Sequence, residues 1–169
     1  MQNRLKRSYR VASELARNDQ FAGAIDFSDL TRLGEHVLGA DGAIEVEFAF
    51  VKNDFDHPLL RGRVRASLQV ECQRCLEPMK LDIDQALELL IDASDADIEA
   101  YDTDSVYTDQ GYLDLFEIVE DELMLAMPLI HKHSETDCNP YWQPQDSTEL
   151  SAEPVNTPFA ALGALKGTD

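Results

Sequence analysis

The chain alternates apolar and polar side chains along the stretch Leu60-Arg-Gly-Arg-Val-Arg-Ala-Ser-Leu-Gln-Val70. The even-numbered positions hold the apolar residues and glycine, whereas the odd-numbered positions hold Arg61, Arg63, Arg65, Ser67 and Gln69. A period of two places successive side chains on opposite faces of a strand. This stretch therefore predicts a β-strand with one face on a core and the other toward water.

The same period recurs on either side of this stretch. Upstream, Ile44, Val46, Phe48 and Phe50 alternate with Glu45, Glu47 and Ala49. Downstream of Pro78, one parity carries Met79, Leu81, Ile83, Leu87, Leu89 and Ile91, and only Gln85 interrupts it. Three successive amphipathic strands with short connections favour an antiparallel meander.

Helical spacing appears in three other segments. The segment 112–127 has a cap signature in Asp114 and Glu117 and ends before Pro128, and we expect its helix to cover the sheet. The segment 28–38 predicts a first helix behind a Ser28 cap. The segment 157–167 predicts a short C-terminal docking helix, because Pro158 suits its first position.

These elements define an α+β fold: an antiparallel β-sheet, in the form of a meander, packs with a helix, and a short C-terminal helix follows. We predict one domain over residues 1–138, with an acidic loop at about 92–110. A polar, proline-containing linker over 139–156 connects it to the helix at 157–167. The length of 169 residues suits one domain with a sizeable core.

The chain is strongly acidic, with 33 aspartates and glutamates, 14 lysines and arginines, and a formal net charge of -19. Such a field repels phosphate backbones and attracts basic partners. No lysine or arginine occurs from Leu81 to His131. A solvated face is one explanation, and an acidic partner surface is the other. Its candidate residues are Asp95, Asp97, Glu99, Asp102, Asp104, Glu117, Glu120 and Asp121.

A local basic stripe offers an alternative. The arginines Arg61, Arg63, Arg65 and Arg74 could contact RNA phosphates or a partner despite the overall acidity. Alternatively, the strand arginines form ordinary cross-strand ion pairs with Glu45 and Glu47.

Three cysteines carry the strongest chemical signal. Cys72-Gln-Arg-Cys75 falls where two strands meet, and a tight turn there can aim two thiolates at one tetrahedral metal ion. Cys138 would be the third ligand, and His133 or His131 the fourth, which makes zinc the candidate ion. The alternative is a set of reduced thiols without a metal. An odd number of cysteines without an export signal disfavours a disulfide framework and indicates the cytoplasm.

Other functional classes lack a signal. The sequence has no glycine-rich phosphate loop, nucleophile elbow or dinucleotide fingerprint, so we expect neither an enzyme nor a small-molecule substrate. No run approaches the roughly 18 apolar residues that a membrane-spanning helix needs.

Four separated motifs resemble the YceD family, the large ribosomal RNA subunit accumulation proteins. They are Val70-Glu-Cys-Gln-Arg-Cys-Leu76, the segment Leu113-Asp-Leu-Phe-Glu-Ile-Val-Glu-Asp-Glu-Leu-Met-Leu-Ala-Met-Pro128, Cys138, and Pro158-Phe-Ala-Ala-Leu-Gly-Ala-Leu-Lys166. Some members of the family carry additional cysteine pairs in the tail, whereas this chain has only Cys138 there.

The resemblance implies a role in the synthesis, processing or stability of the large-subunit (23S) ribosomal RNA, without enzymatic activity. The expected partners are a large-subunit ribosomal protein, an assembly factor or the precursor RNA. Together with the net charge, the resemblance suggests that the acidic surface binds a basic ribosomal protein or assembly factor.

Overall fold

The computed structural model describes residues 5–92, 94, 104–134 and 138. In chain order, their elements are β1 (Ser8–Arg10), α1 (Val11–Arg17), β2 (Gln20–Ile25), the 3-10 helix η1 (Phe27–Asp29), α2 (Thr31–Gly34), β3 (Gly39–Ala40), β4 (Ile44–Lys52), β5 (Pro58–Glu71), β6 (Pro78–Ile91), β7 (Ser105–Val106), β8 (Tyr112–Asp114) and α4 (Leu115–Ala126). The predicted linker at 139–156, the helix at 157–167 and residues 95–103 of the acidic loop lie outside the described residues.

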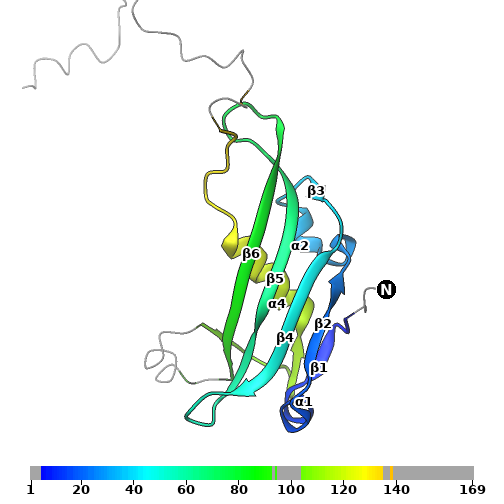
Figure 1. Ribbon diagram of the computed structural model, residues 1–169, viewed down its shortest axis with the longest axis vertical. Coiled ribbons are helices and arrows are strands. Elements are labelled where there is room, and N and C mark those ends of the chain that lie inside the picture. The colour runs from blue at the N-terminus through cyan, green and yellow to red at the C-terminus, as the bar shows by residue number, and fades with distance from the viewer. Residues whose placement is uncertain (1–4, 93, 95–103, 135–137, 139–169) are drawn as a thin grey trace, which may run out of the picture. The chain divides into compact units, whose positions relative to one another are not determined.

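One twisted sheet with the strand order β2-β4-β5-β6-β7 forms the centre of the fold (Figure 1). β5 pairs antiparallel with β4, which precedes it, and with β6, which follows it, and this confirms the predicted meander. β2 extends it antiparallel to β4, β3 pairs with β5, and β7 runs parallel to β6. β1 and β8 form a separate two-stranded ladder. The fold is therefore α+β with a largely antiparallel sheet.

The alternation in the sequence decides which face of the sheet is buried. Leu60, Val64 and Leu68 on β5 are inaccessible to water, and they belong to one core with Leu115, Val119 and Leu123 on α4. Figure 1 shows α4 lying across one face of β5 and β6. The opposite face of β5 carries the arginines, so the predicted division between core and solvent is confirmed.

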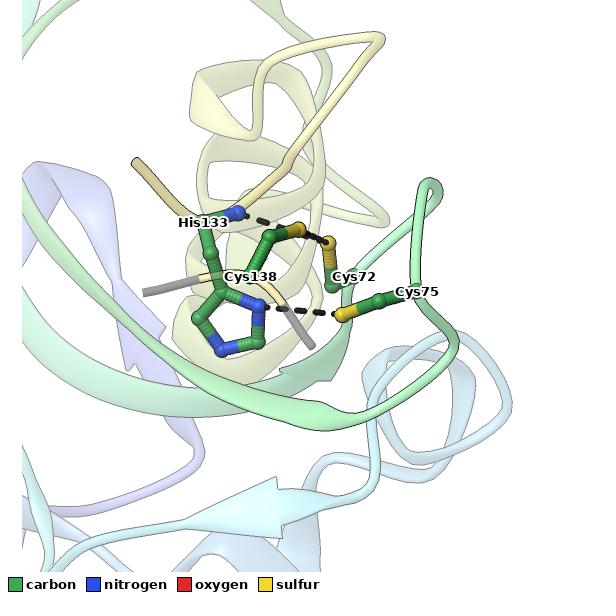
Figure 2. A group of neighbouring side chains, drawn as sticks. All are labelled: Cys72, Cys75, His133 and Cys138. Carbon is green, nitrogen blue, oxygen red and sulfur yellow. Dashed lines mark hydrogen bonds between the residues drawn. The ribbon is translucent and has the colours of Figure 1, made fainter. Parts of the chain in front are cut away.

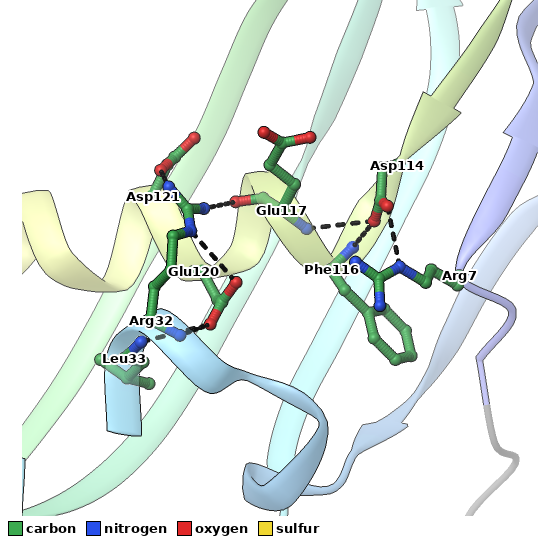
Figure 3. Close-up of polar contacts among 8 residues, drawn as sticks. All are labelled: Arg7, Arg32, Leu33, Asp114, Phe116, Glu117, Glu120 and Asp121. Carbon is green, nitrogen blue, oxygen red and sulfur yellow. Dashed lines mark hydrogen bonds and ion pairs between the residues drawn. The ribbon is translucent and has the colours of Figure 1, made fainter. Parts of the chain in front are cut away.

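α4 begins where its cap signature predicts. The Asp114 carboxylate accepts hydrogen bonds from the backbone N–H groups of Phe116 and Glu117, at 3.0 and 3.2 Å (Figure 3). Arg7 donates to the same carboxylate at 2.8 Å. This contact joins the start of the chain to the start of the helix. The helix ends at Ala126, before Pro128.

The single helix predicted for 28–38 is wrong. The structure has η1 and a one-turn α2 there, and Ser28 caps neither. Leu30 and Leu33 are buried as their spacing indicated, but the chain then leaves the helical path to join the sheet. The backbone N–H of Leu38 donates to the carbonyl of Gln69 at 2.7 Å, and Asp41 donates to Ser67 at 2.8 Å. Pairing with β5 replaces the rest of the helix.

Residues 8–25 also contain structure that the sequence did not reveal. They form β1, α1 and β2. The ring of Phe21 on β2 stacks on Phe48 of β4 with centroids 4.9 Å apart, and Tyr9 contacts both rings edge-on. This aromatic cluster attaches the N-terminal segment to the edge of the sheet.

None of the helices in the described part of the chain is long and apolar enough to cross a membrane.

Candidate metal centre

The turn between β5 and β6 contains the Cys72-Gln-Arg-Cys75 motif. Its backbone closes on itself: the N–H of Cys72 donates to the carbonyl of Glu77 at 2.9 Å, and the N–H of Leu76 donates to the carbonyl of Cys72 at 2.8 Å. Leu76 has a positive φ of 61°, which lets the chain reverse after Cys75. The turn thus places both cysteine side chains on one side of the hairpin tip.

The segment after α4 returns to this tip. Gln73 holds it at two points, because its backbone N–H donates to the carbonyl of His131 at 3.0 Å and its side-chain amide donates to the carbonyl of Leu129 at 3.2 Å. His133 follows directly, and its own backbone N–H points at the sulfur of Cys72 at 3.4 Å. These contacts bring His133, a third potential ligand, to the cysteine pair.

The ligand atoms of Cys72, Cys75, His133 and Cys138 all lie within 4.8 Å of one another (Figure 2). The sulfurs of Cys72 and Cys138 are 3.9 Å apart, and Nδ1 of His133 is 3.3 Å from the sulfur of Cys75. In a tetrahedral zinc site with Zn–S near 2.3 Å and Zn–N near 2.0–2.1 Å, the corresponding separations are about 3.8 and 3.6 Å. The four side chains therefore fit a zinc ion with small adjustments.

Neighbouring groups orient these ligands. Nε2 of His133 lies 3.2 Å from the carbonyl oxygen of Pro78, a contact that requires Nε2–H as the donor and leaves the Nδ1 lone pair for a metal. Arg74 donates from Nε to the sulfur of Cys138 at 2.9 Å, and its terminal nitrogen donates to the carbonyls of His133 and Ser134. With three thiolates around a divalent ion, the site would carry one excess negative charge, which the Arg74 guanidinium offsets.

The surroundings of Cys72 favour the thiolate, which is the form that binds metals. Burial raises the pKa of its thiol, but hydrogen bonds from the backbone N–H groups of Cys75, His133 and Arg74 outweigh burial and lower the pKa to about 5. Burial raises the pKa of the Cys138 thiol, and the hydrogen bond from Arg74 acts in the opposite direction. A metal ion would have to displace a proton from Cys138 but not from Cys72 at neutral pH.

The donor set decides what such a site can do. Three cysteines and one histidine supply all four positions of a tetrahedral zinc ion, whereas catalytic zinc sites keep a position open for water or substrate. The arrangement therefore suits a structural site that ties the segment after α4 to the hairpin tip. The structure selects His133 of the two predicted histidines, because the ring of His131 instead lies 3.4 Å from the carbonyl of Pro128.

The arginines predicted as one stripe separate into two groups. Arg61, Arg63 and Arg65 lie on the open face of β5 and form ion pairs there. Arg61 contacts Glu88 at 3.2 Å, Arg63 contacts Asp84 at 3.2 Å, and Arg65 contacts both Glu47 and Asp84. Arg74 does not belong to this stripe, because the turn carries it into the cysteine cluster. Its position between the two cysteines was the sequence signal for that role.

Glu120 is not part of an acidic partner surface, in contrast to the prediction. It is only 6% exposed, and its carboxylate accepts hydrogen bonds from the backbone N–H groups of Arg32 and Leu33, at 2.7 and 3.2 Å (Figure 3). These N–H groups begin α2, which has no side-chain cap of its own, so Glu120 supplies the cap from another helix. The fixed backbone dipoles and the Arg32 side chain compensate the buried charge.

Three of the predicted acidic surface residues are described and accessible. Asp104 and Glu117 are exposed, and Asp121 is half exposed and pairs with Arg32 at 2.8 Å. Asp95, Asp97, Glu99 and Asp102 lie outside the described residues. The acidic loop is closed at its base, where the Asp92 carboxylate accepts hydrogen bonds from the backbone N–H and the hydroxyl of Thr108, both at 2.7 Å.

Comparison with known proteins places the chain in one family. Residues 60–166 match the family described as large ribosomal RNA subunit accumulation protein YceD. The chain is also 32% identical over 158 residues to a protein of that name from Haemophilus influenzae, a match that covers 86% of this chain and 87% of the relative. No solved structure matches the chain.

The fold and the site define an α+β protein in which a sheet is covered by one helix and a Cys3His cluster of metal-binding type lies at the tip of the central hairpin. The matched region contains that hairpin tip, α4 and all four potential ligands. The chain belongs to the YceD family.

Proposed function

We propose that this protein is a non-enzymatic cytoplasmic factor that supports the synthesis, processing or stability of 23S ribosomal RNA by binding a basic ribosomal protein or assembly factor. The observation that carries the proposal is the family match over residues 60–166, together with the name of the Haemophilus relative. The effect on RNA is indirect in this proposal, because the net charge of -19 opposes contact with a phosphate backbone.

The ion pairs of the arginines on β5 favour a protein partner over RNA. Each of Arg61, Arg63 and Arg65 has a carboxylate within 3.4 Å. A phosphate would have to displace these carboxylates and also enter the acidic field around them. Exposed ion pairs of this kind contribute little to stability, so their main consequence is to neutralise the stripe locally.

Zinc is the proposed resident ion, held by Cys72, Cys75, His133 and Cys138. Its role is to hold His133 and Cys138, which follow α4, against the hairpin tip, because structural zinc contributes folding energy directly. Cys72 and Cys75 come from the hairpin tip, whereas His133 and Cys138 follow α4, which is far from the hairpin tip in sequence. Metal content of the purified protein, measured by plasma mass spectrometry, is expected to show one zinc per chain.

A pull-down tests the functional proposal. The tagged protein is recovered from its host at low and moderate salt, with and without RNase, and its companions are identified by mass spectrometry and RNA sequencing. We expect a basic large-subunit ribosomal protein or assembly factor that resists RNase. Recovery of precursor RNA alone, abolished by RNase, would contradict a protein-mediated role.

Direct RNA contact through the arginine face is the second candidate function, and charge reversal separates it from the first. A double variant with Arg63→Glu and Arg65→Glu is expected to leave recovery of the protein partner unchanged. The pair Asp104→Lys and Glu117→Lys, on the accessible acidic residues, is expected to reduce it. The opposite result would assign the binding surface to the arginine face of β5. In that case, the arginine substitutions would also lower the salt dependence of RNA binding, because fewer phosphate contacts are made.

A further inference from the structure

A groove lies between α4 and the edge of the sheet that β7 forms. Its volume is about 530 Å³, and its lining includes Val106, Ile118 and Leu125 together with the carboxylates of Asp104, Asp121 and Glu122. The floor is apolar, and three of the lining residues are carboxylates. No lysine or arginine lines it among the described residues.

Glu122 is the unusual group in this groove. Its side chain is only 8% exposed, yet the one hydrogen bond found for it within the described chain is a long contact of 3.4 Å from the amide of Gln85. Glu120, two residues earlier on α4, contrasts with it because two backbone N–H groups and Arg32 compensate its charge. Burial raises the pKa of Glu122, and the nearby carboxylates of Asp104 and Asp121 raise it further.

The groove also has an exposed apolar rim. Leu125 is 77% exposed at the end of α4, although it contributes to the groove lining. Isolated surface leucines are ordinary, but this one adjoins an apolar floor and a buried carboxylate. An occupant could remove the Leu125 side chain from water and at the same time bring a cation that compensates the buried carboxylate of Glu122.

We infer that this groove receives a basic segment of the partner protein, in which an arginine or lysine contacts Glu122 and Asp104 while an adjacent large apolar side chain packs on Val106 and Leu125. The inference rests on the proposed function and identifies the part of the surface that carries it. Charge complementarity commits the groove to a cationic occupant: Arg32 pairs with Asp121, but no ion pair to a lysine or arginine is found for Asp104 or Glu122 within the described residues. An amphipathic helix that lays its apolar face into a groove is a recurring mode of peptide recognition, and basic residues beside that face would suit the carboxylates here.

Binding of defined peptides to the full-length protein tests the chemistry. The probe is a fluorescent amphipathic peptide of about 15 residues with leucines on one helical face and arginines on the other. Two companion peptides replace either the leucines with serine or the arginines with glutamine. We expect the first peptide to bind by fluorescence anisotropy at moderate salt and each companion to bind more weakly by about tenfold or more, because each companion lacks one of the two kinds of anchor.

Matched variants locate the site. Leu125→Glu and Asp104→Lys are expected to weaken binding of the probe by about tenfold. The controls Leu38→Glu and Asp54→Lys alter an exposed leucine and an exposed aspartate elsewhere and make the same changes of charge. They are expected to leave the affinity within about twofold, given that rim charges away from a contact have small effects. Equal losses in variants and controls, or no binding of the probe, would overturn the inference.

A photo-crosslinker at position 125 identifies the occupant directly. An adduct with the probe supports the inference, whereas an adduct with residues 157–166 of the same chain or with a second copy would assign the groove to that occupant and overturn it. The pull-down keeps the two proposals distinguishable: if Leu125→Glu retains the RNase-resistant partner, the groove assignment fails while the functional proposal stands.

Discussion

In the middle of the domain, β5 and β6 lie beneath α4, and leucine and valine side chains fill the space between them. At the tip of the same hairpin, the two strands run into a turn whose neighbours are thiols, an imidazole and a guanidinium. The sheet body is stabilised by burial of apolar surface, which any well-packed set of side chains can provide. The tip buries little apolar surface, so its conformation depends on a few specific donors. The two regions should therefore respond to different perturbations.

The largest expected effect comes from the core of the body. Leu123→Ala removes a side chain with no exposed surface from the contact between α4 and the sheet, and we expect it to lower the free energy of unfolding by about 2–5 kcal/mol. Urea denaturation followed by circular dichroism measures the change. Leu125→Ala is the matched control on the same helix, where exposure limits the change to about 0.5 kcal/mol. Similar losses for both would contradict the assigned orientation of α4.

The cap that Glu120 supplies to α2 gives the next largest effect. Glu120→Ala leaves the backbone N–H groups of Arg32 and Leu33 without their acceptor inside the protein. We expect a loss of about 1–3 kcal/mol in the free energy of unfolding. Glu117→Ala changes an exposed carboxylate three residues earlier and should cost less than about 0.5 kcal/mol. Hydrogen exchange should place the loosening at α2, and equal exchange in both variants would contradict the capping role.

At the tip, the expected effect is local and depends on the metal. His133→Ala should abolish binding of the proposed zinc ion and loosen the segment after α4, while β4 and β5 retain their protection from hydrogen exchange. His131→Ala is the matched control, because its ring lies outside the ligand set, and it should retain the zinc. Chelation of the unaltered protein should reproduce the effect of His133→Ala. A loss of protection throughout the sheet would show that the two regions are not independent.

The smallest expected effect is a pH dependence in the body. Burial raises the pKa of Glu122 in the folded state above its unfolded value of about 4.3. The folded chain therefore holds the proton more tightly, and stability falls as pH rises from the unfolded pKa through the raised folded pKa. Glu122→Gln should remove this slope and raise Tm at neutral pH by an amount on the order of 2 °C. Thermal melts from pH 4 upward, in steps of about one unit, measure the slope, and an unchanged slope would contradict the assignment.

The sequence predictions were accurate where an element depends on interactions between residues close together in the sequence, and wrong where it depends on distant ones. The strands around Val46, Val64 and Ile83 were predicted because alternation is local and is repeated many times. The start of α4 was predicted because Asp114 bonds to residues only two and three positions away. The helix over 28–38 was wrong because pairing of Leu38 with Gln69 in β5 overrides the local apolar spacing.

The candidate site shows the same division. The cysteine pair was recognisable from its spacing, and Cys138 followed as the remaining thiol. The choice of His133 over His131 was open in the sequence, since both lie within a few residues of Cys138. It depends on how Gln73 holds the returning chain, which is a contact between segments more than fifty residues apart.

Short-range periodicity and spacing are enough to predict the three-stranded meander, its buried face, the covering helix and the residue types of the candidate metal centre. The roles of the acidic and basic side chains depend instead on tertiary contacts. Glu120 became a buried cap, Glu122 a nearly uncompensated carboxylate in a groove, and Arg74 a neighbour of the thiols. A charged residue acquires its role from the partner that folding places beside it, and the spacing of residues along one element contains no information about that partner.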